Sequence, residues 1–193
     1  MGNANVKSGE LGDADLYTNQ LKYGKYIEKK KKVYGFLYLI ASVVSLVAIF
    51  ALPIFRYAVK GNRRYNTASI MGDYTPTYII QKYFANELGA KGVLNTCLII
   101  SILFMIIISA YTVIGAVMNI FLKKLLDSNK LFSKLFNYGM LEIISTIFLI
   151  LLFAIMIFCK VDVSGAAENL FGFWTICAAS VVMICTSIPL SSK

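Results

Sequence analysis

Residues 93–122 read VLNTCLIISILFMIIISAYTVIGAVMNIFL, an apolar run that contains no Asp, Glu, Lys or Arg. A helix of about 18 or more such residues is long enough to cross the hydrocarbon core of a bilayer. Three further runs are also long and apolar: Val33–Phe55, Leu135–Cys159 and Leu170–Pro189. Of the four runs, only Leu135–Cys159 contains a charged residue. The whole chain is 58% hydrophobic with a mean hydropathy of +0.70, whereas soluble domains are about 45–50% apolar. The sequence therefore predicts an all-α integral, multi-pass membrane protein built as a four-transmembrane-helix bundle.

The polar segments lie at the ends of the chain and between the apolar runs. Residues 1–32 are rich in Gly, Asn, Asp and Lys and have little to bury, which favours a partly disordered, polybasic tail. Residues 33–189 form the predicted membrane domain, and residues 190–193 form a short C-terminal tail. No polar stretch is long enough to fold as a second domain, because such short segments bury too little surface.

The longest connection, residues 56–92, contains a predicted amphipathic helix at 76–88. Thr75 is suited to cap its start, Pro76 fits the first helical position and Gly89 is suited to end it. Apolar residues recur at helical spacing along this segment at Ile80, Phe84 and Leu88. Three placements remain open for the helix: packed on the bundle, lying on the outer bilayer surface, or docked to a partner.

Basic residues next to the apolar runs predict how the protein sits in the membrane. Lysines are more numerous on the side that holds both termini, so both termini are predicted to be cytoplasmic, with the cell membrane as the expected location. Tyr34, Phe36 and Tyr38 are predicted to lie at the headgroup level on that side. A run of four lysines is predicted to contact anionic lipid headgroups: Lys29, Lys30, Lys31 and Lys32.

Several chemistries lack the residues that they need. The chain has no His, which removes the commonest general base and the commonest metal ligand. It also has no phosphate-binding or dinucleotide-binding motif, so we expect no enzyme, no cofactor and no metal site. The net charge of +9 lies mostly beside the apolar runs, so nucleic acid is not an expected partner. A disulfide between Cys159 and Cys177 is left open.

One acidic residue, Glu142, lies inside an apolar run. A charged group at that depth is costly and is expected to face the bundle interior with polar partners. Helical spacing and depth place polar residues of the first three runs near it. These form a candidate intramembrane cluster with Glu142: Tyr138, Ser145, Thr112, Asn119 and Ser42.

The absence of catalytic, cofactor and repeat signatures predicts a non-enzymatic protein that acts through other proteins. An accessory, scaffold or assembly subunit fits this pattern, with a membrane-protein partner or a homo-oligomer as the expected assembly. The alternative is a small transporter or channel that uses Glu142, because intramembrane acids mark ion and proton paths in carriers. Internal repeats and broken helices, which carriers commonly show, are missing from this sequence.

Overall fold

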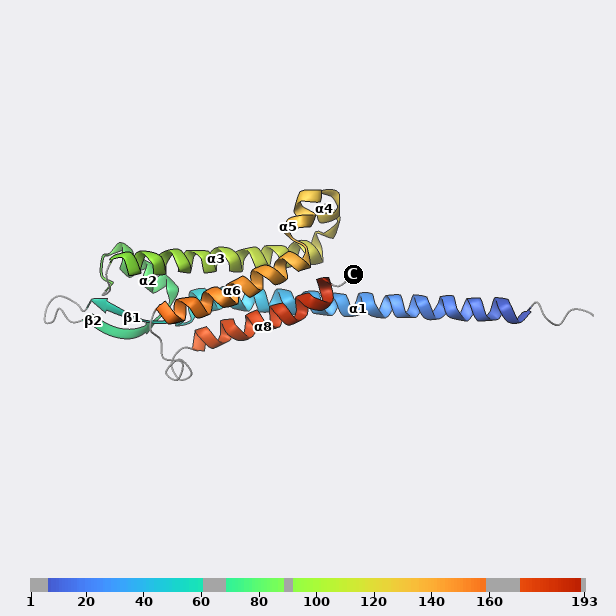
Figure 1. Ribbon diagram of the computed structural model, residues 1–193, viewed down its shortest axis with the longest axis horizontal. Helices are drawn as coiled ribbons and strands as arrows, with labels where there is room; N and C mark the ends of the chain where they lie inside the picture. Colours follow the sequence, from blue (N-terminus) through green and yellow to red (C-terminus); the bar gives the residue numbers. More distant parts are fainter. Residues whose placement is uncertain (1–6, 61–68, 89–91, 159–170, 192–193) are drawn as a thin grey trace, which may run out of the picture.

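Four long apolar helices pack together in the computed structural model, which describes residues 7–60, 69–88, 92–158 and 171–191. They are α1 (Lys7–Ala51), α3 (Gly92–Phe121), α6 (Tyr138–Phe158) and α8 (Phe171–Ser191). Each contains a segment that is long and apolar enough to cross a membrane. The chain is therefore an integral, multi-pass membrane protein (Figure 1).

The helices are arranged so that α1 packs against α3 and α8, and α6 packs against the same two neighbours. Helices α1 and α6 therefore lie diagonally across the bundle. Large side chains fill the interior, since Tyr38, Phe148 and Phe173 are all 0–1% exposed. The remaining aliphatic surface faces outward on all four helices, as expected where lipid replaces water.

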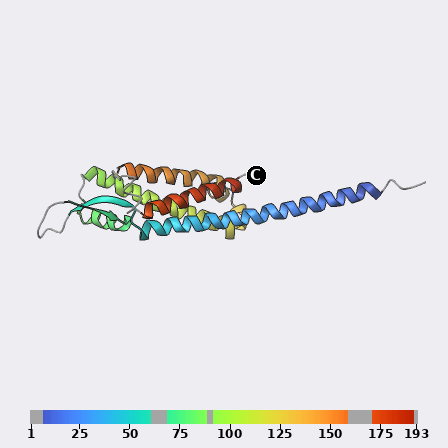
Figure 2. The same ribbon diagram turned by 90° about the horizontal axis from the view of Figure 1, so that it is seen from below.

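Helix α1 extends well beyond the bundle at its N-terminal end (Figures 1 and 2). It is 45 residues long, which at about 1.5 Å per residue is roughly twice the thickness of a bilayer core. The segment predicted as a partly disordered tail is thus helical from Lys7 onward, and Gly24 does not interrupt it. At the other end α1 stops at Ala51, not Phe55, because a residue before proline avoids the helical conformation and Pro53 follows.

The long connection holds a feature that the all-α prediction did not include. Strands β1 (Phe55–Lys60) and β2 (Ser69–Tyr74) form an antiparallel hairpin in which Phe55 pairs with Tyr74 and Lys60 with Ser69. The hairpin lies at the end of the bundle opposite the projecting part of α1 (Figure 1). We call this end, with β1, β2 and the helix that follows, the hairpin end.

Helix α2 (Pro76–Phe84) follows the hairpin and begins where the sequence predicts. The Thr75 side chain accepts a hydrogen bond from the Tyr78 backbone N–H, and Pro76 occupies the first turn. The helix ends at Phe84, short of the predicted residue 88, because Asn86 adopts a left-handed conformation with φ of 55°. Its Ile79 is fully buried in the bundle core, so α2 packs on the bundle.

The opposite end carries the short connection between α3 and α6. Two short helices, α4 (Lys123–Ser128) and α5 (Lys130–Leu135), form this connection. Leu126 of α4 is buried, which holds this corner against the bundle. We call this end, with α4, α5 and residues 28–32 of α1, the lysine end.

Candidate functional site

The polar contact at the centre of the bundle links the two diagonal helices. The Tyr38 hydroxyl of α1 lies 3.0 Å from Ser145 Oγ of α6, and both residues are fully buried. Ser145 Oγ donates to the Leu141 carbonyl of its own helix at 2.7 Å, so Tyr38 supplies the proton in the first contact. Tyr38 was predicted at the headgroup level, but it points inward, because a buried phenol needs a polar partner and Ser145 provides one.

Glu142 lies beside the buried face of α6. The buried positions on this helix recur three or four residues apart, at Leu141, Ser145, Phe148, Leu152 and Ile155. Glu142 is one position away from that face and is only half-buried. Its carboxylate accepts a hydrogen bond of 3.2 Å from Ser191 Oγ, at the last residue of α8. Because α6 begins at Tyr138 and not at Leu135, Glu142 also lies closer to the lysine end than the sequence indicated.

Ser42 and Thr112 are buried in the interior, as their spacing suggested. Their hydroxyls donate to carbonyls of their own helices, Ser42 to Leu39 and Thr112 to Ser109, both at 2.8 Å. This back-bonding satisfies a hydroxyl without a partner helix. In the described part of the chain, no hydrogen bond joins either residue to Glu142.

Asn119 connects α3 to the α5–α6 corner. Its side-chain amide donates to the Gly115 carbonyl at 2.8 Å and also to the Phe136 carbonyl. Nearby, the Tyr111 hydroxyl donates to the Leu135 carbonyl, and the Tyr111 ring stacks on Phe136 at 5.0 Å between centroids. These bonds satisfy carbonyls at a helix end and fix the lysine end.

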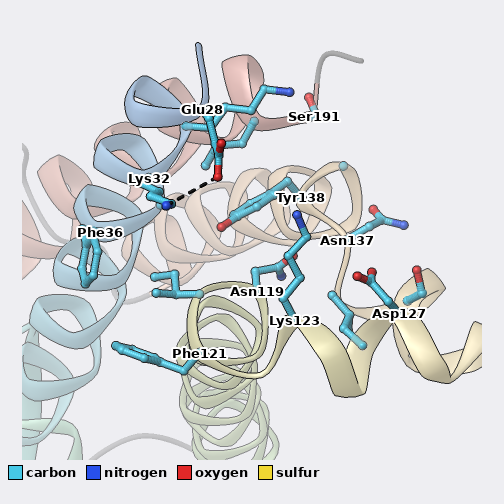
Figure 3. Close-up of a pocket in the computed structure, with 17 residues that line it drawn as sticks. Glu28, Lys32, Phe36, Asn119, Phe121, Lys123, Asp127, Asn137, Tyr138 and Ser191 are labelled. Carbon is cyan, nitrogen blue, oxygen red and sulfur yellow. Dashed lines mark ion pairs between the residues drawn. The ribbon is translucent and has the colours of Figure 1, made fainter. Parts of the chain in front are cut away.

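A pocket of about 890 Å³ opens at the lysine end, bordered by α1, α3, α4, α5, α6 and α8 (Figure 3). We call it the lysine-end pocket. Its wall is apolar where it meets the bundle, at Phe36, Ile120, Phe121, Leu126 and Leu190. Its rim is charged, at Glu28, Lys31, Lys32, Lys123 and Asp127. Such a mixture of apolar wall and few polar groups is typical of a binding site.

Gly35 allows Tyr138 of α6 to approach α1 closely at the wall of this pocket. A Cβ at Gly35 would lie 3.1 Å from the Tyr138 hydroxyl and 3.5 Å from Ile120 Cγ1. Tyr138 itself is half-buried, and its ring meets the Tyr38 ring edge-on at 6.3 Å. The pair of tyrosines therefore separates the pocket from the sealed interior.

The four-lysine run of α1 is exposed, apart from the partly covered Lys31. Lys32 lies 3.5 Å from Glu28 on the preceding turn, and Lys30 lies 4.7 Å above the Tyr26 ring. Lys31 and Lys32 line the pocket, whereas Lys29 and Lys30 do not.

The predicted cluster is therefore not a single site. Ser42 and Thr112 are hydrogen-bonded within their own helices, and the other members lie in three places. Tyr138 and Asn119 line the pocket, Ser145 joins Tyr38, and Glu142 joins Ser191. Sequence reasoning missed Tyr38, Gly35 and Lys123. A tyrosine and a glycine within an apolar run were the available signals for the first two.

Among the described residues, no group of three or more His, Cys, Asp or Glu side chains is placed to hold a metal ion. Of the two cysteines that could form a disulfide, Cys177 is buried on α8, and Cys159 lies outside the described residues. No protein family, curated protein or solved structure matches this chain.

Proposed function

We propose that the protein is a non-enzymatic accessory or assembly subunit that binds a partner protein through the projecting part of α1. The supporting observation is that this part of α1 leaves the bundle as a continuous helix (Figures 1 and 2). Residues 7–32 contain many charged residues and few apolar ones. Most of the stability of a helix in a protein comes from packing, and a partner surface would supply it here.

The orientation that goes with this proposal places the lysine end, and with it both termini, in the cytoplasm. The excess of Lys beside the spans on that side supports it. Single cysteines introduced into a cysteine-free chain test it. A membrane-impermeant maleimide should label Gln81→Cys at the hairpin end in intact cells, and Lys130→Cys at the lysine end only after lysis. Labelling in the reverse order would invert the topology.

Transport through the bundle receives less support. Glu142, the residue on which that alternative depends, is bonded to Ser191 at one end of the bundle and does not line the pocket. The diagonal of the interior is occupied by Tyr38 and Ser145, bonded to each other. Ion flux through vesicles holding the pure protein, compared with Glu142→Gln, tests this alternative. A flux that Glu142→Gln abolishes would favour it over the accessory role.

Gentle solubilisation from the native membrane, followed by mass determination of the intact complex, tests the accessory role. We expect a stoichiometric foreign subunit with the full chain. Gly24→Pro should lose it, because proline breaks a helix interior at a cost of about 3 kcal/mol. Gly24→Ala is the matched control, since its Cβ meets no atom within 4 Å, and it should retain the partner. A lone chain or a pure homo-oligomer would overturn the proposal.

A further inference from the structure

The lysine-end pocket lies at the level where the membrane spans end. Three of the residues that line it are span termini: Phe121 ends the span of α3, Tyr138 begins that of α6 and Ser191 ends that of α8. The apolar wall of the pocket therefore lies beside the hydrocarbon, and its charged rim lies among the headgroups. A ligand that fills it must be apolar at one end and polar at the other.

The rim has more ammonium groups than carboxylates. Lys31, Lys32 and Lys123 line it, against Glu28 and Asp127. Glu28 is already engaged, because its carboxylate lies 3.5 Å from the Lys32 ammonium. Among the described residues, Lys123 has no carboxylate within 4 Å. The rim thus offers positive charge to an anion.

A neutral hydrogen-bond donor, the hydroxyl of Tyr138, also lines the pocket. The Tyr138 hydroxyl makes no hydrogen bond to the described residues, although the residue is half-buried. It packs close to Gly35, where a Cβ would lie only 3.1 Å from the hydroxyl oxygen. Figure 3 shows Lys32 of α1, Lys123 of α4 and Tyr138 of α6 around this common space.

The wall suits a hydrocarbon chain. Phe36 and Phe121 meet edge-to-face at 6.2 Å, and they are 46% and 62% exposed. Both rings therefore have a free surface on the outside of the bundle, where lipid lies. An acyl chain in contact with these rings would join the pocket directly to the bilayer.

We propose that the lysine-end pocket binds one anionic phospholipid. Its phosphate lies between Lys123 and the α1 lysines and accepts a hydrogen bond from the Tyr138 hydroxyl, and its acyl chains follow Phe36 and Phe121. Basic pockets between transmembrane helices hold lipid headgroups in this way, and the volume of about 890 Å³ is within the usual range of ligand pockets. The site needs no partner protein, so it stands independently of the accessory role.

The test compares two adjacent lysines on one helix. Lys123 lines the pocket, whereas Lys124 is exposed on α4 and does not. The full chain is reconstituted in phosphatidylcholine vesicles, and the binding of spin-labelled phosphatidylglycerol is measured against that of spin-labelled phosphatidylcholine. We expect Lys123→Gln to reduce the preference for phosphatidylglycerol by up to about fivefold, the effect of one lysine near a headgroup. Lys124→Gln should keep the preference of the unchanged chain.

A second variant removes the hydroxyl without changing the charge. Tyr138→Phe should also lower the preference for phosphatidylglycerol, and the fold is not at risk because the described residues make no hydrogen bond to this hydroxyl. Equal losses for Lys123→Gln and Lys124→Gln would indicate general surface charge and overturn the site. If the unchanged chain bound phosphatidylglycerol no more tightly than phosphatidylcholine, the proposed lipid site would also be overturned.

Soluble glycerol phosphate distinguishes a lipid from a free phosphate. It carries the same phosphate chemistry but no acyl chain, so an excess of it should leave the bound phosphatidylglycerol in place. Displacement of the lipid by glycerol phosphate would assign the pocket to a soluble anion and overturn the proposal. Native mass determination of the detergent-solubilised chain provides the independent readout, with one phospholipid retained per chain expected.

Discussion

At the hairpin end, Ile54 and Ile79 are buried to 0–1% exposure, whereas at the lysine end Phe121 and Lys123 border an open pocket. The two ends of the same four-helix bundle thus differ, because one is closely packed and the other is open. Glycines allow close approach at both ends, Gly172 between α8 and the end of α1 and Gly35 between α1 and Tyr138, but the lysine end also holds the pocket of about 890 Å³. We therefore expect the hairpin end to contribute stability, and our proposal assigns lipid binding to the lysine end.

The largest expected effect tests whether the hairpin end is a structural cap. Ile79→Ala removes a fully buried side chain from the core and should lower the free energy of unfolding by about 2–5 kcal/mol, the usual cost of such a cavity. Phe84→Ala, on the same helix but 80% exposed, should change it by less than about 0.5 kcal/mol. Denaturant unfolding in detergent measures both. Equal effects would show that α2 does not seal the bundle.

Close packing at Gly172 is the next target. A Cβ there would lie 2.5 Å from the Pro53 carbonyl oxygen and 2.7 Å from Leu52 Cβ. Because the nearest of these atoms belongs to the backbone and not to the far end of a flexible side chain, Gly172→Ala should destabilise the protein by about 1–3 kcal/mol, as overpacking does. Gly24→Ala has no neighbour to displace and should leave the melting temperature unchanged or raise it. A tolerated Gly172→Ala would mean that α1 and α8 are not in close contact.

A third prediction addresses the boundary between the sealed interior and the pocket. Tyr38→Phe removes the contact with Ser145 and should cost about 1 kcal/mol, in the range of hydrogen bonds between membrane helices. The cost stays small because Ser145 keeps its bond to the Leu141 carbonyl. Tyr34→Phe is the control, since its hydroxyl makes no hydrogen bond within the described chain. If Tyr38→Phe and Tyr34→Phe lowered the free energy of unfolding equally, the hydrogen bond of Tyr38 would not contribute to stability.

Features that depend on the hydrophobicity of a long segment could be predicted from the sequence. Features that depend on how a helix is rotated about its own axis could not. The four spans were predictable because hydrophobicity adds up over each helix, and the start of α2 was predictable because Thr75 and Pro76 are local signals. The hairpin was missed because short strands give a weaker pattern. Tyr38 was misplaced because composition does not say which way a helix turns its side chains.

The candidate site shows the same limit. The sequence placed Tyr138 and Asn119 at one level, and both line the pocket. It did not indicate Lys123, because this residue lines the pocket only through the placement of α4 at the end of α3. Glu142 stands out in the sequence as a rare intramembrane acid. Its contact with Ser191 could not be predicted, because it depends on where α6 begins and α8 ends. Helix boundaries are the least reliable part of a sequence prediction.

The smallest effect concerns the ion pair between the last turn of α2 and the residues that follow it, where Lys82 Nζ lies 2.5 Å from Glu87 Oε2. The hydrogen bond to Glu87 raises the pKa of Lys82. A raised pKa means that the pair stabilises the folded state fully below the unfolded pKa of lysine, about 10.4, and loses this contribution as the pH rises through the folded pKa. The melting temperature should therefore be slightly higher than that of Lys82→Gln at neutral pH, and the gap should close in strongly alkaline buffer. In a Glu87→Gln background, which removes the carboxylate partner, Lys82→Gln should show no such pH-dependent gap. A difference that persists at high pH would mean that Lys82 acts through packing on Tyr78, whose ring centroid is 5.3 Å away, and not through its charge.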